Sequence, residues 1–133
     1  AATMTGSAPL TYDAGIDVSR HNGVIQWGRV SRVVQFAYVR ATMGTTGRDD
    51  KYGVNWRGAR AAGLPFLGAY HYFVAGLPGE GQANNFLNVL GGDHGNLPPV
   101  VDVEPRAGEI LSPAARSAFT CCWARRPRAA VRP

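Results

Sequence analysis

The sequence has none of the long apolar runs of a membrane protein, and few of the residues that build disulfide-rich or metal-binding proteins. Its apolar stretches fall far short of the roughly 20 consecutive residues that cross a bilayer, so we expect no membrane partner. The only cysteines, Cys121 and Cys122, are adjacent in sequence, and adjacent cysteines rarely bridge each other. His21 and His94 have no further ligand at metal spacing, so we predict no metal site.

The formal charge of +5 does not describe a basic surface, because the excess lies in one segment. Residues 1–111 hold nine Lys and Arg against nine Asp and Glu, whereas residues 112–133 hold five Arg and no acid. A neutral body offers no basic face that could follow phosphates, which argues against nucleic acid as a partner. We predict a folded domain over residues 12–109 and a basic Ala/Arg/Pro-rich tail over residues 110–133, irregular or disordered. An out-of-frame stretch of a GC-rich gene would have the same composition as this tail.

Strand-like and helical segments alternate along the domain. The strand-like runs are rich in Val, Ile, Phe or Tyr and bounded by Gly, Pro or Asn; they are 14–19, 36–42, 66–74 and 99–104. The helical segments between them are 27–34, 55–62 and 80–90. Asn55 is the predicted N-cap of the second helix, and Gly91 is the predicted stop of the third. This alternation predicts an α/β fold with a parallel sheet.

The last predicted strand carries the most informative motif, Asp102-Val103-Glu104. Side chains alternate along a strand, so Asp102 and Glu104 share one face at its carboxyl end, where β/α folds place active sites. Two carboxylates in a partly dry cleft push their pKa values apart, which leaves one protonated and one ionised, as glycosidic-bond hydrolysis requires. The motif also fits solvated residues at a strand end, or ligands for a hard cation such as calcium or magnesium.

Polar and aromatic residues on the other strands extend this candidate site. Asp17 is a third acid at a strand end, although a lone Asp is often a cap or turn residue. Arg40 fits either a partner for the acids or substrate, or a structural ion pair. Tyr70 and Tyr72 share one face of their strand and fit either cleft or core aromatics. His71 points to the opposite face, where a structural role is expected.

Eight blocks of the sequence together resemble glycoside hydrolase family 25, in order and in spacing. The resemblance covers about residues 12 to 106. The blocks are Gly15-Ile16-Asp17-Val18-Ser19, Asn22-Gly23-Val24-Ile25-Gln26-Trp27, Tyr38-Val39-Arg40-Ala41-Thr42, 50–55, Ala62-Gly63-Leu64, Gly68-Ala69-Tyr70-His71-Tyr72-Phe73, Gln82-Ala83-Asn84-Asn85-Phe86 and Val101-Asp102-Val103-Glu104.

This resemblance implies a secreted lysozyme that cleaves the β-1,4 bond between N-acetylmuramic acid and N-acetylglucosamine in bacterial peptidoglycan, without a cofactor. Glu104 would be the general acid. Asp102 would orient the 2-acetamido group of the substrate or act as nucleophile, and Asp17 would polarise the site. The expected substrate-binding residues are Tyr70, Arg40 and Tyr72. The segment from Ala1 to Leu10 has neither a basic start nor an apolar stretch, so an exported chain would already have lost its signal.

The resemblance also implies a barrel of which this sequence contains only the first part. Members of the family form a (β/α) barrel of the TIM-like type, with further strands and another acid after the D-x-E strand, whereas this sequence has no acid after Glu109. We therefore expect an incomplete barrel of the first four or so β/α units, with an open sheet edge that favours self-association. The alternative to an active muramidase is a truncated, inactive fragment that at most binds cell-wall glycan or self-associates.

Overall fold

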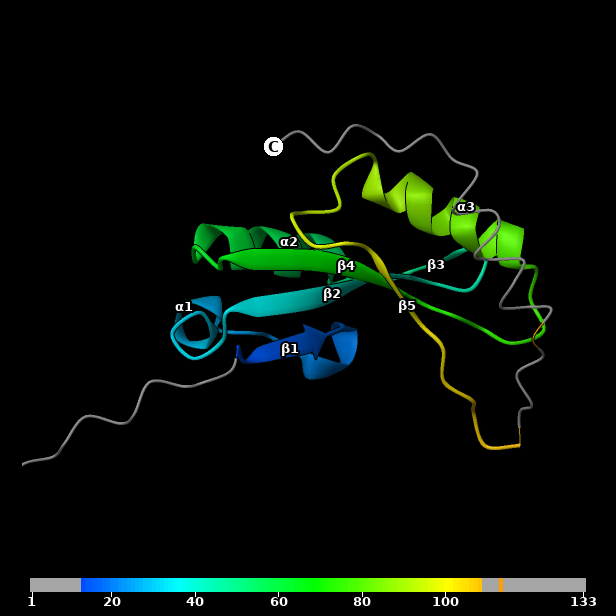
Figure 1. Cartoon of the computed structure of the whole chain (residues 1–133), viewed down its shortest axis with the longest axis horizontal. Coiled ribbons are helices and arrows are strands. Elements are labelled where there is room, and N and C mark those ends of the chain that lie inside the picture. Colours follow the sequence, from blue (N-terminus) through cyan, green and yellow to red (C-terminus); the bar gives the residue numbers. More distant parts are fainter. Residues whose placement is uncertain (1–12, 109–112, 114–133) are drawn as a thin grey trace, which may run out of the picture.

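The computed structural model describes residues 13–108 and Pro113 (Figure 1). All predicted strands and helices fall within this part of the chain. The predicted basic tail, with Cys121 and Cys122, lies outside the described residues except for Pro113.

Four parallel strands form the sheet, in the order β1-β2-β4-β5 (Figure 1). A two-residue strand, β3, pairs antiparallel with the end of β2. The bounds are β1 Gly15–Val18, β2 Phe36–Met43, β3 Gly47–Arg48, β4 Phe66–Tyr72 and β5 Val100–Asp102. All four predicted strands are present. Strand β2 extends one residue beyond its predicted end, whereas β5 ends at Asp102, two residues before its predicted end, so Glu104 lies after the strand.

The helices differ from the predictions mainly at their ends. Their bounds are η1 Arg20–Asn22, α1 Trp27–Val30, α2 Tyr52–Ala61 and α3 Gly79–Leu90. Helix α1 is shorter than predicted because the backbone N–H groups of Val33 and Val34 both turn back to the Val30 carbonyl. Gly91 ends α3 in the left-handed conformation, with φ of 57°, as predicted.

The predicted N-cap of α2 is wrong. The helix begins three residues before Asn55, and the backbone N–H of Lys51 at its start donates to the carboxylate of Asp49 over 2.9 Å. Asn55 lies buried inside the helix, where its Oδ1 accepts a hydrogen bond from Nε1 of Trp27 over 3.4 Å. Asn55 is thus the fourth residue of α2 and does not precede the helix, as an N-cap does.

The two faces of the sheet have different neighbours. The apolar core lies on the face that packs against the helices, and its strand residues are Val18, Ala37, Val39, Ala41, Leu67 and Ala69. Asp17, Tyr38 and Gly68 pair across β1, β2 and β4 and point to the opposite face, as do Arg40 and Tyr70 in the next row. This second face carries the candidate site.

The observed architecture is an α/β fold with a parallel sheet, and the sheet is not closed within the described residues. In that part of the chain, no helix combines the length and the apolar character that a bilayer span requires.

Candidate active site

The predicted catalytic acids come from the two outer strands of the sheet. Asp17 lies on β1 and Asp102 ends β5, while Glu104 follows Asp102 by two residues in the segment after the strand. Asp17 and Glu104 are exposed, and Asp102 is half-buried. The sheet thus brings Asp17 and Asp102, which are 85 residues apart in sequence, to one face.

The carboxyl of Asp102 lies near enough to Glu104 and Asp17 for their charges to act on its pKa. Burial raises the pKa of the Asp102 carboxyl above its ordinary value. The negative charge of Glu104 and a hydrogen bond with it raise that pKa further, and so does the charge of Asp17. Arg40 acts in the opposite direction. The Asp102 carboxyl is therefore favoured in its protonated form, beside the Glu104 carboxyl to which it is hydrogen-bonded.

Tyr70 lies among the same charges. It is buried, 8% exposed, and is paired with Arg40 in the register of β2 and β4. Burial raises the pKa of its hydroxyl to about 12, an effect that Arg40 opposes and that Asp17 and Asp102 strengthen. The hydroxyl therefore stays protonated and can donate a hydrogen bond to a carboxylate or a sugar oxygen.

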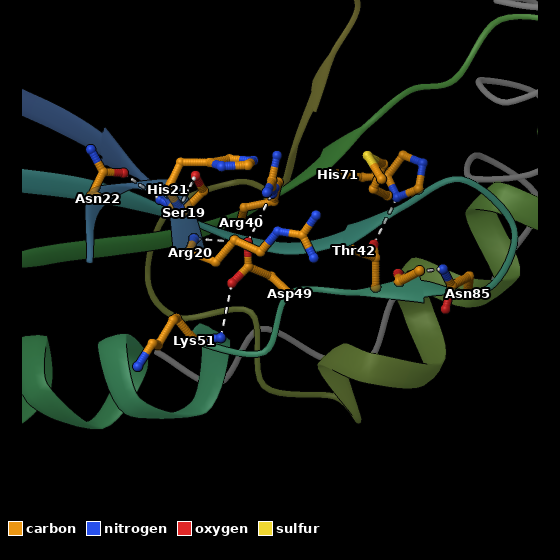
Figure 2. Close-up of polar contacts among 12 residues, drawn as sticks. Ser19, Arg20, His21, Asn22, Arg40, Thr42, Asp49, Lys51, His71 and Asn85 are labelled. Carbon is orange, nitrogen blue, oxygen red and sulfur yellow. Dashed lines mark hydrogen bonds and ion pairs between the residues drawn. The ribbon is translucent and has the colours of Figure 1, made fainter. Parts of the chain in front are cut away.

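Arg40 forms a buried ion pair, which is one of the two roles predicted for this residue. Its Nε donates to Oδ2 of Asp49 over 2.9 Å, and the two side chains are 9% and 1% exposed (Figure 2). The same guanidinium still acts on the pKa values of Tyr70 and Asp102. Arg40 is therefore both a member of an ion pair and a source of positive charge for the cleft.

Tyr72 lies beside the acid pair through strand register. It pairs with Asp102 across β4 and β5 and with Met43 across β2 and β4. The guanidinium of Arg106 lies over the Tyr72 ring at 5.7 Å from its centroid, within the range of a cation–π contact. This contact connects the segment that carries Glu104 to strand β4.

The structure adds three residues that the sequence analysis did not assign to the site. Tyr38 pairs with Asp17, and its hydroxyl donates to the Pro98 carbonyl over 3.1 Å. Asp49 holds Arg40, and Arg106 contacts Tyr72. Strand alternation alone could have indicated Tyr38, because it shares a face with Arg40. No local pattern marks Asp49 or Arg106.

His71 lies outside the cleft, as its position in the strand predicts. It is fully buried on the helix-covered face, and its Nε2 lies 3.1 Å from Oε1 of Gln82 on α3. Within residues 13–108, no group of three or more His, Cys, Asp or Glu side chains is arranged to hold a metal ion.

Comparisons with known proteins agree on one family. The model described as "Glycosyl hydrolases family 25" matches residues 16–128. The chain is 40% identical over 105 residues to the protein YegX of Escherichia coli (strain K12), covering 74% of this chain and 38% of YegX. It is 39% identical over 104 residues to Lysozyme M1 of Streptomyces globisporus, covering 74% of this chain and 35% of the lysozyme.

A solved structure agrees with these sequence matches. The structure of a family 25 glycosyl hydrolase from Bacillus anthracis matches with a TM-score of 0.64 and 34% identity, over 69% of this chain and 42% of the other. The chain thus spans less than two fifths of the length of the two curated relatives, at 38% and 35%.

Proposed function

The chain belongs to glycosyl hydrolases family 25, and from this membership we propose that it is a muramidase that hydrolyses the β-1,4 bond between N-acetylmuramic acid and N-acetylglucosamine in bacterial peptidoglycan. The observation that carries the proposal is the closeness of Asp17 and Glu104 to Asp102, whose pKa both acids raise. Lysozyme M1 and the Bacillus anthracis hydrolase support the class of reaction by similarity.

In this proposal Glu104 protonates the leaving oxygen. It is exposed and lies in the segment after β5, so a glycosidic oxygen can reach its carboxyl. Its carboxyl is hydrogen-bonded to Asp102, whose raised pKa lets Asp102 hold a proton that can pass to Glu104 and from there to the leaving oxygen.

Asp102 is proposed to orient the 2-acetamido group rather than to attack the sugar. A nucleophile must be ionised, whereas burial and the neighbouring acids raise the pKa of Asp102 and oppose its ionisation. Asp17 is proposed to polarise the cleft, and the proposed substrate contacts are Tyr70, Arg40 and Tyr72.

The four parallel strands are proposed to correspond to the first units of a TIM-like barrel, because the chain overlays part of a larger family 25 structure. In the described sheet β1 and β5 each have one strand neighbour, so these edges are the proposed surfaces for self-association. Peptidoglycan lies outside the cytoplasmic membrane, so the proposed location is extracellular.

Clearing of a Gram-positive cell-wall suspension by the 133-residue chain tests the proposal. Glu104→Gln keeps the size of the side chain and removes its acid, and we expect the rate of clearing to fall by about 10²-fold or more. Glu80→Gln is the matched control, because Glu80 is an exposed acid in the first turn of α3. Equal clearing by wild type and Glu104→Gln would overturn the assignment. Folded wild-type protein that sediments with cell walls but does not clear them would favour the inactive glycan-binding fragment.

A further inference from the structure

Asp49 is a buried carboxylate that connects three segments around the cleft. The residue is 4% exposed. Its Oδ2 accepts from the backbone N–H of Arg20 over 3.0 Å and from Nε of Arg40 over 2.9 Å, and its Oδ1 accepts from the backbone N–H of Lys51 over 2.9 Å (Figure 2). These donors belong to η1, to strand β2 and to the start of α2, so one carboxylate connects all three.

The ion pair with Asp49 holds the side chain of Arg40 in place. The candidate site contains three other carboxylates, on Asp17, Asp102 and Glu104, and the charge of Arg40 acts on Asp102. Within the described part of the chain, the ion pair of Arg40 is with Asp49, and none joins it to a cleft acid. Arg40 is only 8% exposed, so its charge needs an anionic partner inside the protein.

We propose that Asp49 is a positioning residue for the cleft: by pairing with Nε of Arg40 it holds the guanidinium beside Tyr70 and prevents it from forming a direct ion pair with the catalytic carboxylates. This inference rests on the proposed muramidase function for its catalytic meaning, whereas the placement of Arg40 can be tested without turnover. The backbone also contributes, because the N–H of Asp49 donates to the Ala41 carbonyl over 2.9 Å, directly beside Arg40.

The physical reason is competition among anions for one buried cation. An amide in place of the Asp49 carboxylate keeps one of the two acceptor oxygens and no longer neutralises Arg40. The guanidinium then gains most by turning toward Asp102 and Asp17, whose charges already interact with the neighbouring Tyr70. A direct pair with Arg40 would hold Asp102 ionised and would weaken the proton sharing between Asp102 and Glu104.

The experiment follows the Asp102 carboxyl by ¹³C NMR across a pH titration of the full chain. Asp49→Asn is expected to lower the pKa of Asp102, because Arg40 moves closer to it. The matched control is Asp93→Asn: Asp93 also accepts from an arginine and from a backbone N–H, but its ion pair with Arg60 is exposed and lies outside the cleft. An Asp102 pKa that stays unchanged or rises in folded Asp49→Asn would overturn the proposal.

A second variant keeps the test decisive if Asp49→Asn does not fold. Arg40→Gln removes the cation and leaves Asp49 with its two backbone donors, and it is expected to raise the pKa of Asp102. An unchanged pKa in Arg40→Gln would show that Arg40 does not act on the cleft, which also overturns the proposal.

Turnover separates this inference from the proposed function. If wild type clears cell walls, Asp49→Asn should lower kcat by about tenfold or more with a smaller change in KM, whereas Asp93→Asn should leave both near wild type. If wild type clears nothing, the proposed function fails while the NMR result still decides where Arg40 lies.

Discussion

The hydroxyl of Thr42 lies 2.7 Å from Nδ1 of His71, and this contact depends on an irregularity in strand β2 (Figure 2). The register of β2 and β4 shifts between Arg40 and Thr42, so that Ala41 is an extra residue. Without the shift, alternation would place Thr42 on the same face as Arg40. The bulge therefore places Arg40 on the cleft face and Thr42 on the helix-covered face, opposite His71.

The second ring nitrogen of His71 extends this network to helix α3. Oε1 of Gln82 lies 3.1 Å from Nε2 of His71 and also accepts the backbone N–H of Val74 over 2.9 Å. Nε2 of Gln82 donates to the carbonyls of Val74 and Leu77. The network thus fixes the segment after β4 to the helix that packs behind the cleft.

Burial of His71 predicts that stability falls on mild acidification. Burial lowers the pKa of His71 below its ordinary value of 6.5, and the hydrogen bond with Gln82 only partly opposes this. Below that ordinary value the unfolded chain binds a proton that the folded chain does not, so the free energy of unfolding decreases as the pH falls. Urea denaturation between about pH 7.5 and about pH 5.5 should show this decrease, and His71→Gln should reduce it.

The control for this prediction is His21→Gln, because His21 is exposed and its backbone N–H, not its ring, donates to the Ser19 hydroxyl that caps η1. That variant should keep the wild-type dependence on pH. An equally steep loss of stability in His71→Gln would contradict the assignment of the effect to His71.

Gly68 is predicted to be essential for the packing of Tyr38 in the cleft. A Cβ atom on Gly68 would lie 2.4 Å from Cε1 of Tyr38 and 2.9 Å from Cβ of Leu97. Gly68→Ala must displace the Tyr38 ring, and we expect it to lower the free energy of unfolding by about 1–3 kcal/mol, measured by urea denaturation. Gly28→Ala is the control, because nothing lies within 4 Å of a Cβ there. Equal stability of the two variants would show that the Tyr38 ring has room to move.

The sequence was sufficient to predict the four strands. Short β-branched and aromatic runs between glycine and proline have few other structures available to them, so the four strands could be predicted. The face shared by Arg40 and Tyr38, and the opposite directions of Tyr70 and His71, followed from alternation.

Contacts made by residues far apart in sequence could not be predicted in the same way. The start of α2 depends on the side chain of Asp49, which is also bonded to Arg20 across 29 residues. Asn55 has the usual features of an N-cap, but tertiary packing places it under Trp27 instead. The bulge at Ala41 leaves no local signal, because strand β2 contains no Gly or Pro that would mark it.

The opposite pKa shifts of Asp102 and Asp93 predict opposite effects of the same substitution on stability. Burial and nearby acids raise the pKa of Asp102, so above its folded pKa the ionised carboxyl destabilises the fold, and Asp102→Asn should raise the free energy of unfolding at pH 7.

The pKa of Asp93 is lowered: burial opposes the shift, and the bidentate pair with Arg60, at 2.8 Å for each contact, outweighs it with the help of the Gly95 N–H. The carboxylate therefore stabilises the fold above its unfolded pKa, a contribution that is lost as the pH falls through the folded pKa, and Asp93→Asn should be less stable than wild type at pH 7. Because Asp93 is half exposed, solvent screens part of this effect.

Urea denaturation of both variants at pH 7 and at about pH 3 checks the pair, because protonation at low pH should bring each variant closer to wild type. If Asp102→Asn proved less stable than wild type at pH 7, the carboxylate would have stabilising partners that its surroundings of Glu104 and Asp17 do not supply. If Asp102→Asn is instead more stable than wild type and inactive on cell walls, the Asp102 carboxyl lowers stability but is needed for catalysis. Acids that are brought together for catalysis are expected to lower stability in this way.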